Sequence, residues 1–187
     1  MTSAANLAQT NLPETDLRYP IGQFNPAPAI TAADRATWLQ EIEQLPGILA
    51  RTVSGWSDEQ LDTPYRPGGW TVRQVVHHLP DSHLNCYQRY RLALTEDAPL
   101  IKPYDEAAWA ELPDAKRGPI DLSLSLLSAL HARWAILLRS LSNEQFARTF
   151  QHPERGELRL DWTLGLYAWH GRHHLAHISN LHDRQGW

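Results

Sequence analysis

The chain of 187 residues has a single cysteine, Cys86, and therefore no intrachain disulfide that could hold a small fold together. A lone free thiol fits a reducing compartment, and we expect a cytoplasmic protein. The segment 1–15 lacks the basic-then-apolar pattern of a signal peptide. No stretch approaches the roughly 18 apolar residues of a transmembrane helix, so we expect no membrane partner.

Basic residues are also few. The 17 lysines and arginines are outnumbered by 21 aspartates and glutamates, which gives a net charge of -4 and argues against a nucleic-acid partner. The hydrophobic content of 42% and charged content of 20% are those of a globular protein. There are no internal repeats or low-complexity segments. The length suits one domain with a sizeable core.

Four segments have the apolar spacing of long helices. Thr31 and Thr71 are the expected N-caps of helices that reach about Ser54 and Thr95, with Asp34 completing a capping box after Thr31. Two further helices are expected over about 121–141 and 161–184. Pro46 predicts a kink or break in the first helix.

The remaining segments are predicted to be irregular. Residues 1–30 are rich in proline and read as an extended N-terminal arm that lies on the domain formed by residues 31–187. Residues 96–120 form a long connection with a short helical piece at about 106–112, and 146–160 read as a small β-hairpin with Gly156 in its turn. The prediction is an all-α four-helix bundle with a long crossover between the second and third helices.

Four of the ten histidines lie within eight residues of the last predicted helix, at positions 170, 173, 174 and 177. At 100° per residue, His170, His174 and His177 share a face with apolar residues, which places them inward, while His173 lies at its flank. Two histidines four residues apart project in parallel, and this spacing is typical of zinc-binding helices. His170 and His174 are therefore the predicted metal ligands from this helix.

The second predicted helix offers a third ligand. His78 lies beside its apolar stripe and is the better-placed inward candidate, whereas His77 points to the polar side and is expected at the surface. His83 lies within the stripe and is expected to be a hydrogen-bonded core residue. His131 and His152 are isolated in the sequence and are taken as structural or surface residues. Three protein ligands leave a coordination position open, as in catalytic rather than structural zinc sites.

At these residues the sequence resembles the DinB/YfiT-like family, most closely its bacillithiol-transferase and metal-dependent hydrolase branch. The resemblance covers nearly the whole chain from about Tyr19. It is carried by the segments 61–66, 68–79, 81–83, 103–106, 164–167, 169–174 and 176–178. It implies a four-helix bundle and a three-histidine centre for zinc or nickel that maps to His78, His170 and His174. It also implies a homodimer. Pro80 departs from the family pattern and predicts a kink near His78 or a helix that restarts at Pro80.

The first hypothesis is therefore an enzyme, a metal-dependent hydrolase whose open coordination position activates water against a small-molecule substrate. Zn²⁺ is the preferred metal and Ni²⁺ the alternative, because imidazole suits both. His177 is a candidate proton shuttle or a partner that supports the ligands. The second hypothesis is a thiol S-transferase, in which a low-molecular-weight thiol attacks a small electrophile. The third is a non-catalytic helical dimer that its metal stabilises.

Overall fold

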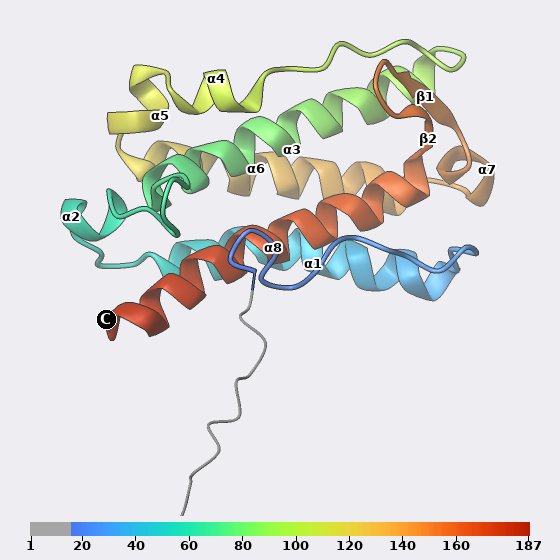
Figure 1. Ribbon diagram of the computed structural model, residues 1–187. Coiled ribbons are helices and arrows are strands. Elements are labelled where there is room, and N and C mark those ends of the chain that lie inside the picture. The colour runs from blue at the N-terminus through green and yellow to red at the C-terminus, as the bar shows by residue number, and fades with distance from the viewer. Residues whose placement is uncertain (1–15) are drawn as a thin grey trace, which may run out of the picture.

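Four long helices run side by side in this computed structural model, which describes residues 16–187 (Figure 1). They are α1 (Ala32–Thr52), α3 (Val72–Thr95), α6 (Ile120–Ser140) and α8 (Leu160–Gln185). Helices α1 and α8 run in one direction, and α3 and α6 run in the other. Each of α1 and α3 packs against both α6 and α8. The predicted four-helix bundle is confirmed, with helix bounds within two residues of those expected at most ends.

Capping side chains fix where the helices begin. The side chains of Thr31 and Thr71 each accept a hydrogen bond from the backbone N–H three residues on, and the side-chain oxygens of Asp34 and Gln74 accept one from the cap backbone N–H. These reciprocal boxes satisfy amides that a helix start leaves unpaired. Gly186 ends α8 with a φ of 69°, a left-handed conformation that glycine adopts without strain. The N-termini of α1 and α3 are thus where the sequence predicts them.

The two helical prolines do not interrupt their helices. Helix α1 continues through Pro46 and α3 through Pro80, and both prolines are buried in the bundle. The break considered at Pro46 and the restart considered at Pro80 are therefore wrong. A proline removes one backbone hydrogen bond. The packing of long amphipathic helices on both sides of each proline outweighs that loss.

A long crossover returns the chain from the end of α3 to the start of α6, along the outer side of α3 (Figure 1). It contains α4 (Glu106–Ala110) and α5 (Pro113–Arg117), of which only the first was expected. The short helices α2 (Asp58–Leu61) and α7 (Asn143–Phe146) were also not predicted. The predicted hairpin is present as β1 (Thr149–His152) paired antiparallel with β2 (Gly156–Arg159).

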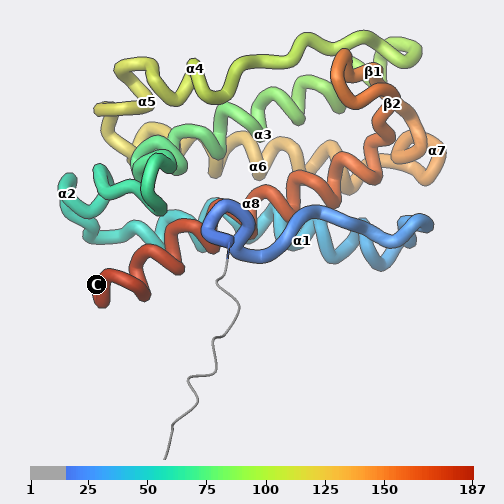
Figure 2. The backbone as a smooth tube through the Cα atoms, in the orientation of Figure 1, coloured from blue at the N-terminus to red at the C-terminus, as the bar shows by residue number. Residues whose placement is uncertain are grey.

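The segment 16–30 has no helix and lies across α1 and α8 (Figure 2). The Phe24 ring packs edge-on against Trp162 of α8, with ring centroids 5.4 Å apart, and against Trp38 of α1 at 6.4 Å. The indole of Trp169 donates a hydrogen bond to the carbonyl of Gly22. The rest of the expected arm, residues 1–15, lies outside the described residues.

The apolar core is divided into two clusters with histidines between them. One cluster centres on Tyr90, Trp134, Phe150 and Leu164, and the other on Leu49, Val72, Val76, Leu127 and Ile178. Among the buried residues of α8, the first cluster ends with Tyr167 and the second begins with Ile178. The histidines of α8 fill the interval between them. Such a buried polar layer is stable only if its groups find partners.

Helix α6 is long and apolar enough to cross a membrane by length and composition, contrary to the prediction that no stretch approaches a transmembrane helix. Only 28% of its most apolar window is buried in the structure. However, Leu127, His131, Trp134 and Leu138 of this helix all face the core. The core helix of a soluble protein meets the same criterion, so this feature is weak evidence for a membrane span.

Candidate metal centre

Three histidines meet where α3 and α8 pack together. The Nε2 atom of His170 lies 3.2 Å from Nε2 of His78 and 3.2 Å from Nε2 of His174. All three nitrogens lie within 4.8 Å of one another. The two helices contribute residues that are 92 positions apart in the sequence. The structure thus brings together the three residues that the sequence predicts as ligands.

These nitrogens fit a metal ion by both spacing and chemistry. Two imidazole nitrogens bound at 2.0–2.1 Å to a tetrahedral Zn²⁺ lie about 3.3 Å apart, close to the two 3.2 Å separations. The donor set is three imidazoles without a carboxylate, which suits zinc, nickel, copper or iron better than calcium or magnesium. Three ligands also leave room for a fourth, exchangeable one.

Burial keeps the three imidazoles neutral and therefore able to bind a cation. His78 and His174 are 8% and 7% exposed, and His170 is half-buried. Burial, with repulsion from His173 as a smaller cause, lowers the pKa of His78 to about 4. Burial also lowers the pKa values of His170 and His174 well below 6.5, and the neighbouring histidines add to this. Each of these residues offers a lone pair near neutral pH.

Further histidines lie against the second ring nitrogens of two of the ligands, His170 and His174. Nε2 of His83 lies 3.2 Å from Nδ1 of His170, and Nδ1 of His83 lies 2.9 Å from Nε2 of His131. Both are buried, so the prediction that His83 is a hydrogen-bonded core residue is confirmed. His131 is not an isolated structural residue as expected, because α6 packs it against His83. Nδ1 of His177 lies 3.4 Å from Nδ1 of His174.

His77 is also placed differently from the prediction. It is 8% exposed, not a surface residue, and its ring nitrogens bond to the hydroxyl of Ser123 and the carbonyl of Gly118. The end of the crossover and the first turn of α6 cover the side of α3 that looked polar in the sequence. His77 therefore points away from the cavity, and His78 is the residue of this pair that reaches the site.

His173 lies beside the ligands without joining them. Its ring stacks on Trp169 at 4.6 Å, and its buried Nδ1 has no hydrogen-bond partner among the described residues. The nitrogens of His173, His174 and His177 also lie within 4.8 Å of one another. His174 thus belongs to two histidine groups, one facing the cavity and one facing the N-terminal arm.

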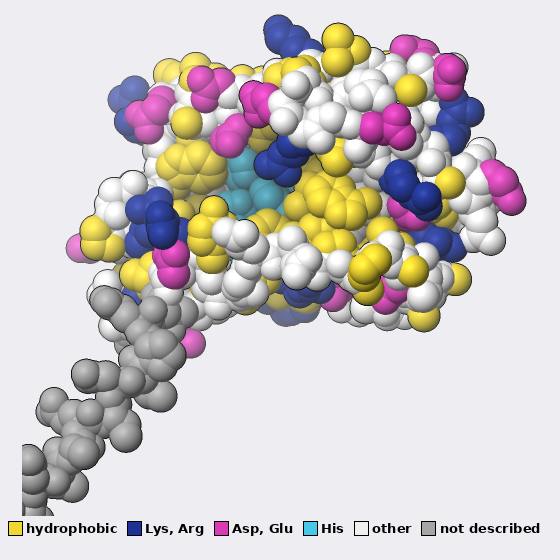
Figure 3. Space-filling model, turned by 45° about the vertical axis from the view of Figure 1, so that its right-hand side comes forward, with side chains coloured by type: hydrophobic (Ala, Val, Ile, Leu, Met, Phe, Trp, Pro, Cys, Tyr) yellow, Lys and Arg dark blue, Asp and Glu magenta, His cyan; other side chains and the backbone are white. Residues whose placement is uncertain are grey.

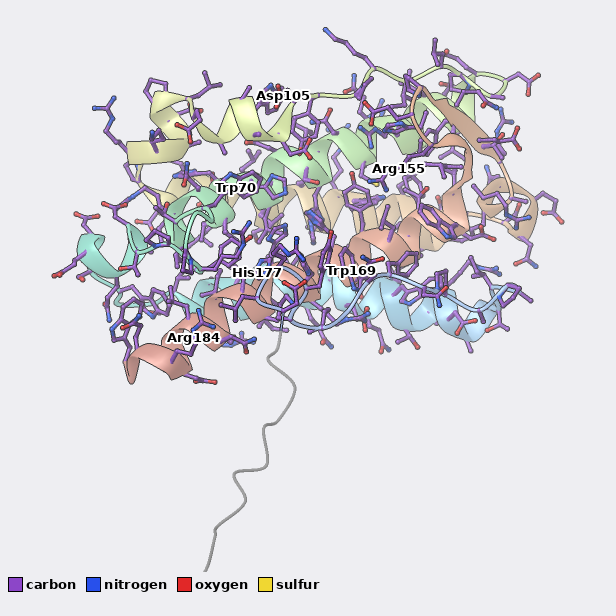
Figure 4. The ribbon with its side chains drawn as sticks, viewed as in Figure 1. Trp70, Asp105, Arg155, Trp169, His177 and Arg184 are labelled. Atoms are coloured by element: carbon purple, nitrogen blue, oxygen red, sulfur yellow. The ribbon has the colours of Figure 1, made fainter. Side chains whose placement is uncertain are left out.

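The three predicted ligands line a cavity of about 930 Å³. Figure 3 shows histidine side chains in a hollow between hydrophobic surfaces. Aromatic residues form much of the wall, with Trp70 before α3 and Trp169 on α8 (Figure 4). The Trp70 ring lies 4.8 Å from that of His78. The further lining residues that carry polar groups are Gln23, Ser82, Arg89, Tyr104, Asp105, Glu106, His152, Glu154, Arg155, Thr163 and Tyr167.

Two of these polar residues, Tyr104 and Arg89, offer different groups to a ligand. Burial raises the pKa of Tyr104 to about 12, so its hydroxyl is a neutral hydrogen-bond donor and acceptor. Arg89 is half-buried in the wall and brings a permanent positive charge. A cavity with apolar walls, a few polar groups and a cluster of metal-ligating residues has the properties of a small-molecule site.

Comparison with known proteins shows the family of the chain. Residues 41–178 match the family model described as the DinB superfamily. The chain belongs to the DinB superfamily. A protein of Bacillus cereus (strain B4264) named "Putative metal-dependent hydrolase" is 58% identical over 172 residues, which are 92% of this chain and 99% of the relative. A protein of Bacillus mycoides (strain KBAB4) with the same name has the same identity and coverage.

Two solved structures share the fold of this chain. YfiT from Bacillus subtilis superposes with a TM-score of 0.89 at 52% identity, covering 91% of this chain and 98% of YfiT. It is described as "a probable metal-dependent hydrolase with an unusual four-helix bundle topology". TT2238, "a four-helix bundle protein", has a TM-score of 0.53 at 21% identity, covers 82% of this chain and 99% of its own, and shows the fold alone. The resemblance to the DinB/YfiT-like family is confirmed.

Proposed function

We propose that this protein is a metal-dependent hydrolase whose metal ion is held by His78, His170 and His174. The observation that carries the proposal is the convergence of three neutral Nε2 atoms in the wall of a cavity, with Nε2 of His170 3.2 Å from each of the other two. The names of the Bacillus relatives agree with it. We expect Zn²⁺, with Ni²⁺ as the alternative, because three imidazoles suit both.

When bound, such an ion supplies Lewis acidity, which lowers the pKa of a ligand in its open position and polarises an electrophile. The chain's own residues do the rest. Trp70 and Trp169 give the cavity apolar walls beside the ligands. Tyr104 can donate a hydrogen bond to a substrate oxygen, and Arg89 can hold an anionic group. A small electrophile, such as an ester or amide, is the substrate class that this arrangement suits.

Thiol S-transfer is the second candidate function, and the size of the cavity supports it. At about 930 Å³ the cavity lies near the upper end of the range for small-molecule sites, about 300–1,000 Å³, so it has room for a thiol beside an electrophile. A non-catalytic protein stabilised by its metal is the third candidate, which the open, lined cavity disfavours.

One activity screen separates these functions. Untagged protein of known zinc content is incubated with a panel of activated esters, amides and small electrophiles, with and without low-molecular-weight thiols. Turnover in water alone supports the hydrolase, and turnover that requires thiol supports the transferase. His170→Ala is expected to lose either activity, whereas His182→Ala, on the same helix but outside the cavity, is the matched control. No turnover in either condition, with a lower melting temperature in His170→Ala, supports the structural role.

A further inference from the structure

Each of the two α8 ligands has its second ring nitrogen against another imidazole, and both series of imidazoles end on a backbone carbonyl. The first series, here called the long chain, runs from His170 Nδ1 to His83 Nε2, and from His83 Nδ1 to His131 Nε2. It ends where His131 Nδ1 meets the carbonyl oxygen of Ile42, at 2.5 Å. This chain joins α8, α3, α6 and α1.

The carbonyl decides where every proton in the long chain lies. A carbonyl oxygen only accepts, so Nδ1 of His131 must carry its proton. A neutral imidazole has one donor and one acceptor, so Nε2 of His131 accepts and Nδ1 of His83 donates. By the same step, Nε2 of His83 accepts from Nδ1 of His170. Nε2 of His170 is then left as a bare lone pair, and it is the atom that faces the other ligands.

The second series, here called the short chain, gives the same result for His174. Nε2 of His177 lies 3.3 Å from the carbonyl oxygen of Arg18, in the N-terminal arm, and so carries the proton. Nδ1 of His177 then accepts from Nδ1 of His174, at 3.4 Å. Nε2 of His174 is left without a proton, only 3.2 Å from the equally bare Nε2 of His170. Figure 4 shows His177 on α8 beside the arm.

Neutral imidazoles are required throughout, and the surroundings supply that condition. His83 and His131 are 0% and 1% exposed, and His177 is 3% exposed. Among the described residues, none of these three rings has a carboxylate as a hydrogen-bond partner. An extra proton on any of them would be a buried, unpaired charge, which is costly.

We propose that the carbonyls of Ile42 and Arg18, acting through His83, His131 and His177, fix His170 and His174 in the tautomer that presents Nε2 to the metal. The proposal rests on the metal centre of the proposed function. These three histidines are positioning residues. Partners of this kind fix ring orientation and raise ligand basicity in metal sites. Metal binding then relieves two lone pairs that face each other at 3.2 Å.

The short chain also decides between the two histidine groups that share His174. A second ion on His173, His174 and His177 would need Nδ1 of His174, because Nε2 of that residue faces the cavity. That nitrogen carries the proton donated to His177. The proposal therefore predicts one tightly bound ion per chain.

The tautomers can be read directly by NMR of protein with ¹⁵N-labelled imidazoles, near neutral pH and free of metal. We expect protons on Nδ1 of His170, His174, His83 and His131, and on Nε2 of His177. A spectrum with Nε2 of His170 or His174 protonated overturns the proposal. This NMR measurement needs no metal. If the wild-type protein fails to bind zinc, the proposed function is overturned, but the spectrum still tests the tautomers set by the long and short chains of imidazoles.

Matched variants connect the tautomers to metal binding. Glutamine at position 83 can accept from His170 and donate to His131, whereas leucine can do neither. We expect His83→Leu to weaken Zn²⁺ binding, measured by competition with a chromophoric chelator, by about 10–100-fold and to mix the tautomers of His170. His83→Gln should stay within about threefold of the wild type, a difference small on that scale.

His177→Leu and His177→Gln test the short chain in the same way. Here the tautomer of His174 is measured together with Zn²⁺ affinity. Circular dichroism and urea unfolding establish that each variant is folded before its affinity is compared, and a variant that does not fold leaves the decision to the wild-type spectrum. Wild-type affinity and unchanged tautomers in both leucine variants would overturn the proposal, as would tight binding of a second zinc equivalent.

Discussion

Acidification should destabilise the metal-free protein, and His131 gives the best-defined part of this effect. The side chain is 1% exposed, and burial lowers its pKa from 6.5 to about 4. Because the folded state binds the proton less readily than the unfolded chain, this residue contributes stability above pH 6.5. That contribution is lost as the pH falls from 6.5 through 4.

The size of the effect follows from the difference between the two pKa values. About 2.5 pH units at about 1.4 kcal/mol each give about 3 kcal/mol from His131 alone. A domain of this kind is stable by about 5–15 kcal/mol in total, so this one residue matters. Burial also lowers the pKa values of His78, His83 and His177, and their contributions have the same sign.

The assay is urea unfolding followed by tryptophan fluorescence, in EDTA at constant ionic strength, from pH 7.5 down to about 4, the folded pKa of His131. The wild-type free energy of unfolding should fall steeply below pH 6.5. His131→Gln should give a shallower dependence, by about the 3 kcal/mol assigned to this residue over the full range. His182→Gln, which removes a histidine with 41% side-chain exposure, should keep the wild-type slope. A wild-type free energy that is flat between pH 7 and 5 would refute the reasoning, as would parallel curves for His131→Gln and the wild type.

Three further predictions concern stability and assembly. Burial and the nearby Asp114 raise the pKa of Asp81 to about 6, so its stabilising contribution is lost as the pH rises through 6. Asp81→Asn should therefore increase the free energy of unfolding at pH 7.5, by on the order of 1 kcal/mol after allowance for solvent screening. The increase should be smaller as the pH falls below 6. An unchanged or lower free energy of unfolding at pH 7.5 would contradict this prediction. A Cβ at Gly171 would lie 2.6 Å from Cδ2 of Leu45. Gly171→Ala should therefore lower the free energy of unfolding by about 1–3 kcal/mol in thermal unfolding, although alanine favours helices. A gain in melting temperature would show that α1 and α8 separate easily. The homodimer stays a prediction, for which sedimentation velocity at micromolar concentration should give about twice the 21.3 kDa chain mass, and a monomer would count against it.

Local chemistry explains which parts of the fold the sequence predicts well. The capping boxes at Thr31 and Thr71 involve residues three positions apart, and the apolar period of each long helix is equally local. His78, His170 and His174 could be predicted as ligands because the face of a helix can be worked out from its sequence alone. Their convergence in the structure depends on the same faces meeting in the bundle.

The parts that were missed depend on contacts between distant segments. His77 looked exposed because nothing in α3 indicates that Ser123 and Gly118 will cover it. His131 is a single histidine in a leucine-rich helix, and only the packing of α6 against α3 brings it to His83. The signal that could have found it is its place on the inner face of that helix, beside Leu127 and Trp134.

The central claim is tested most directly by metal content. Untagged protein is loaded with one equivalent of Zn²⁺, passed through a desalting column and measured by elemental analysis. The wild type and the His182→Ala control should retain about one ion per chain, the number expected for a single three-histidine site. His78→Ala, His170→Ala and His174→Ala should each lose most of it, because two imidazoles hold the ion too weakly. Full zinc occupancy in all three alanine variants would contradict the account.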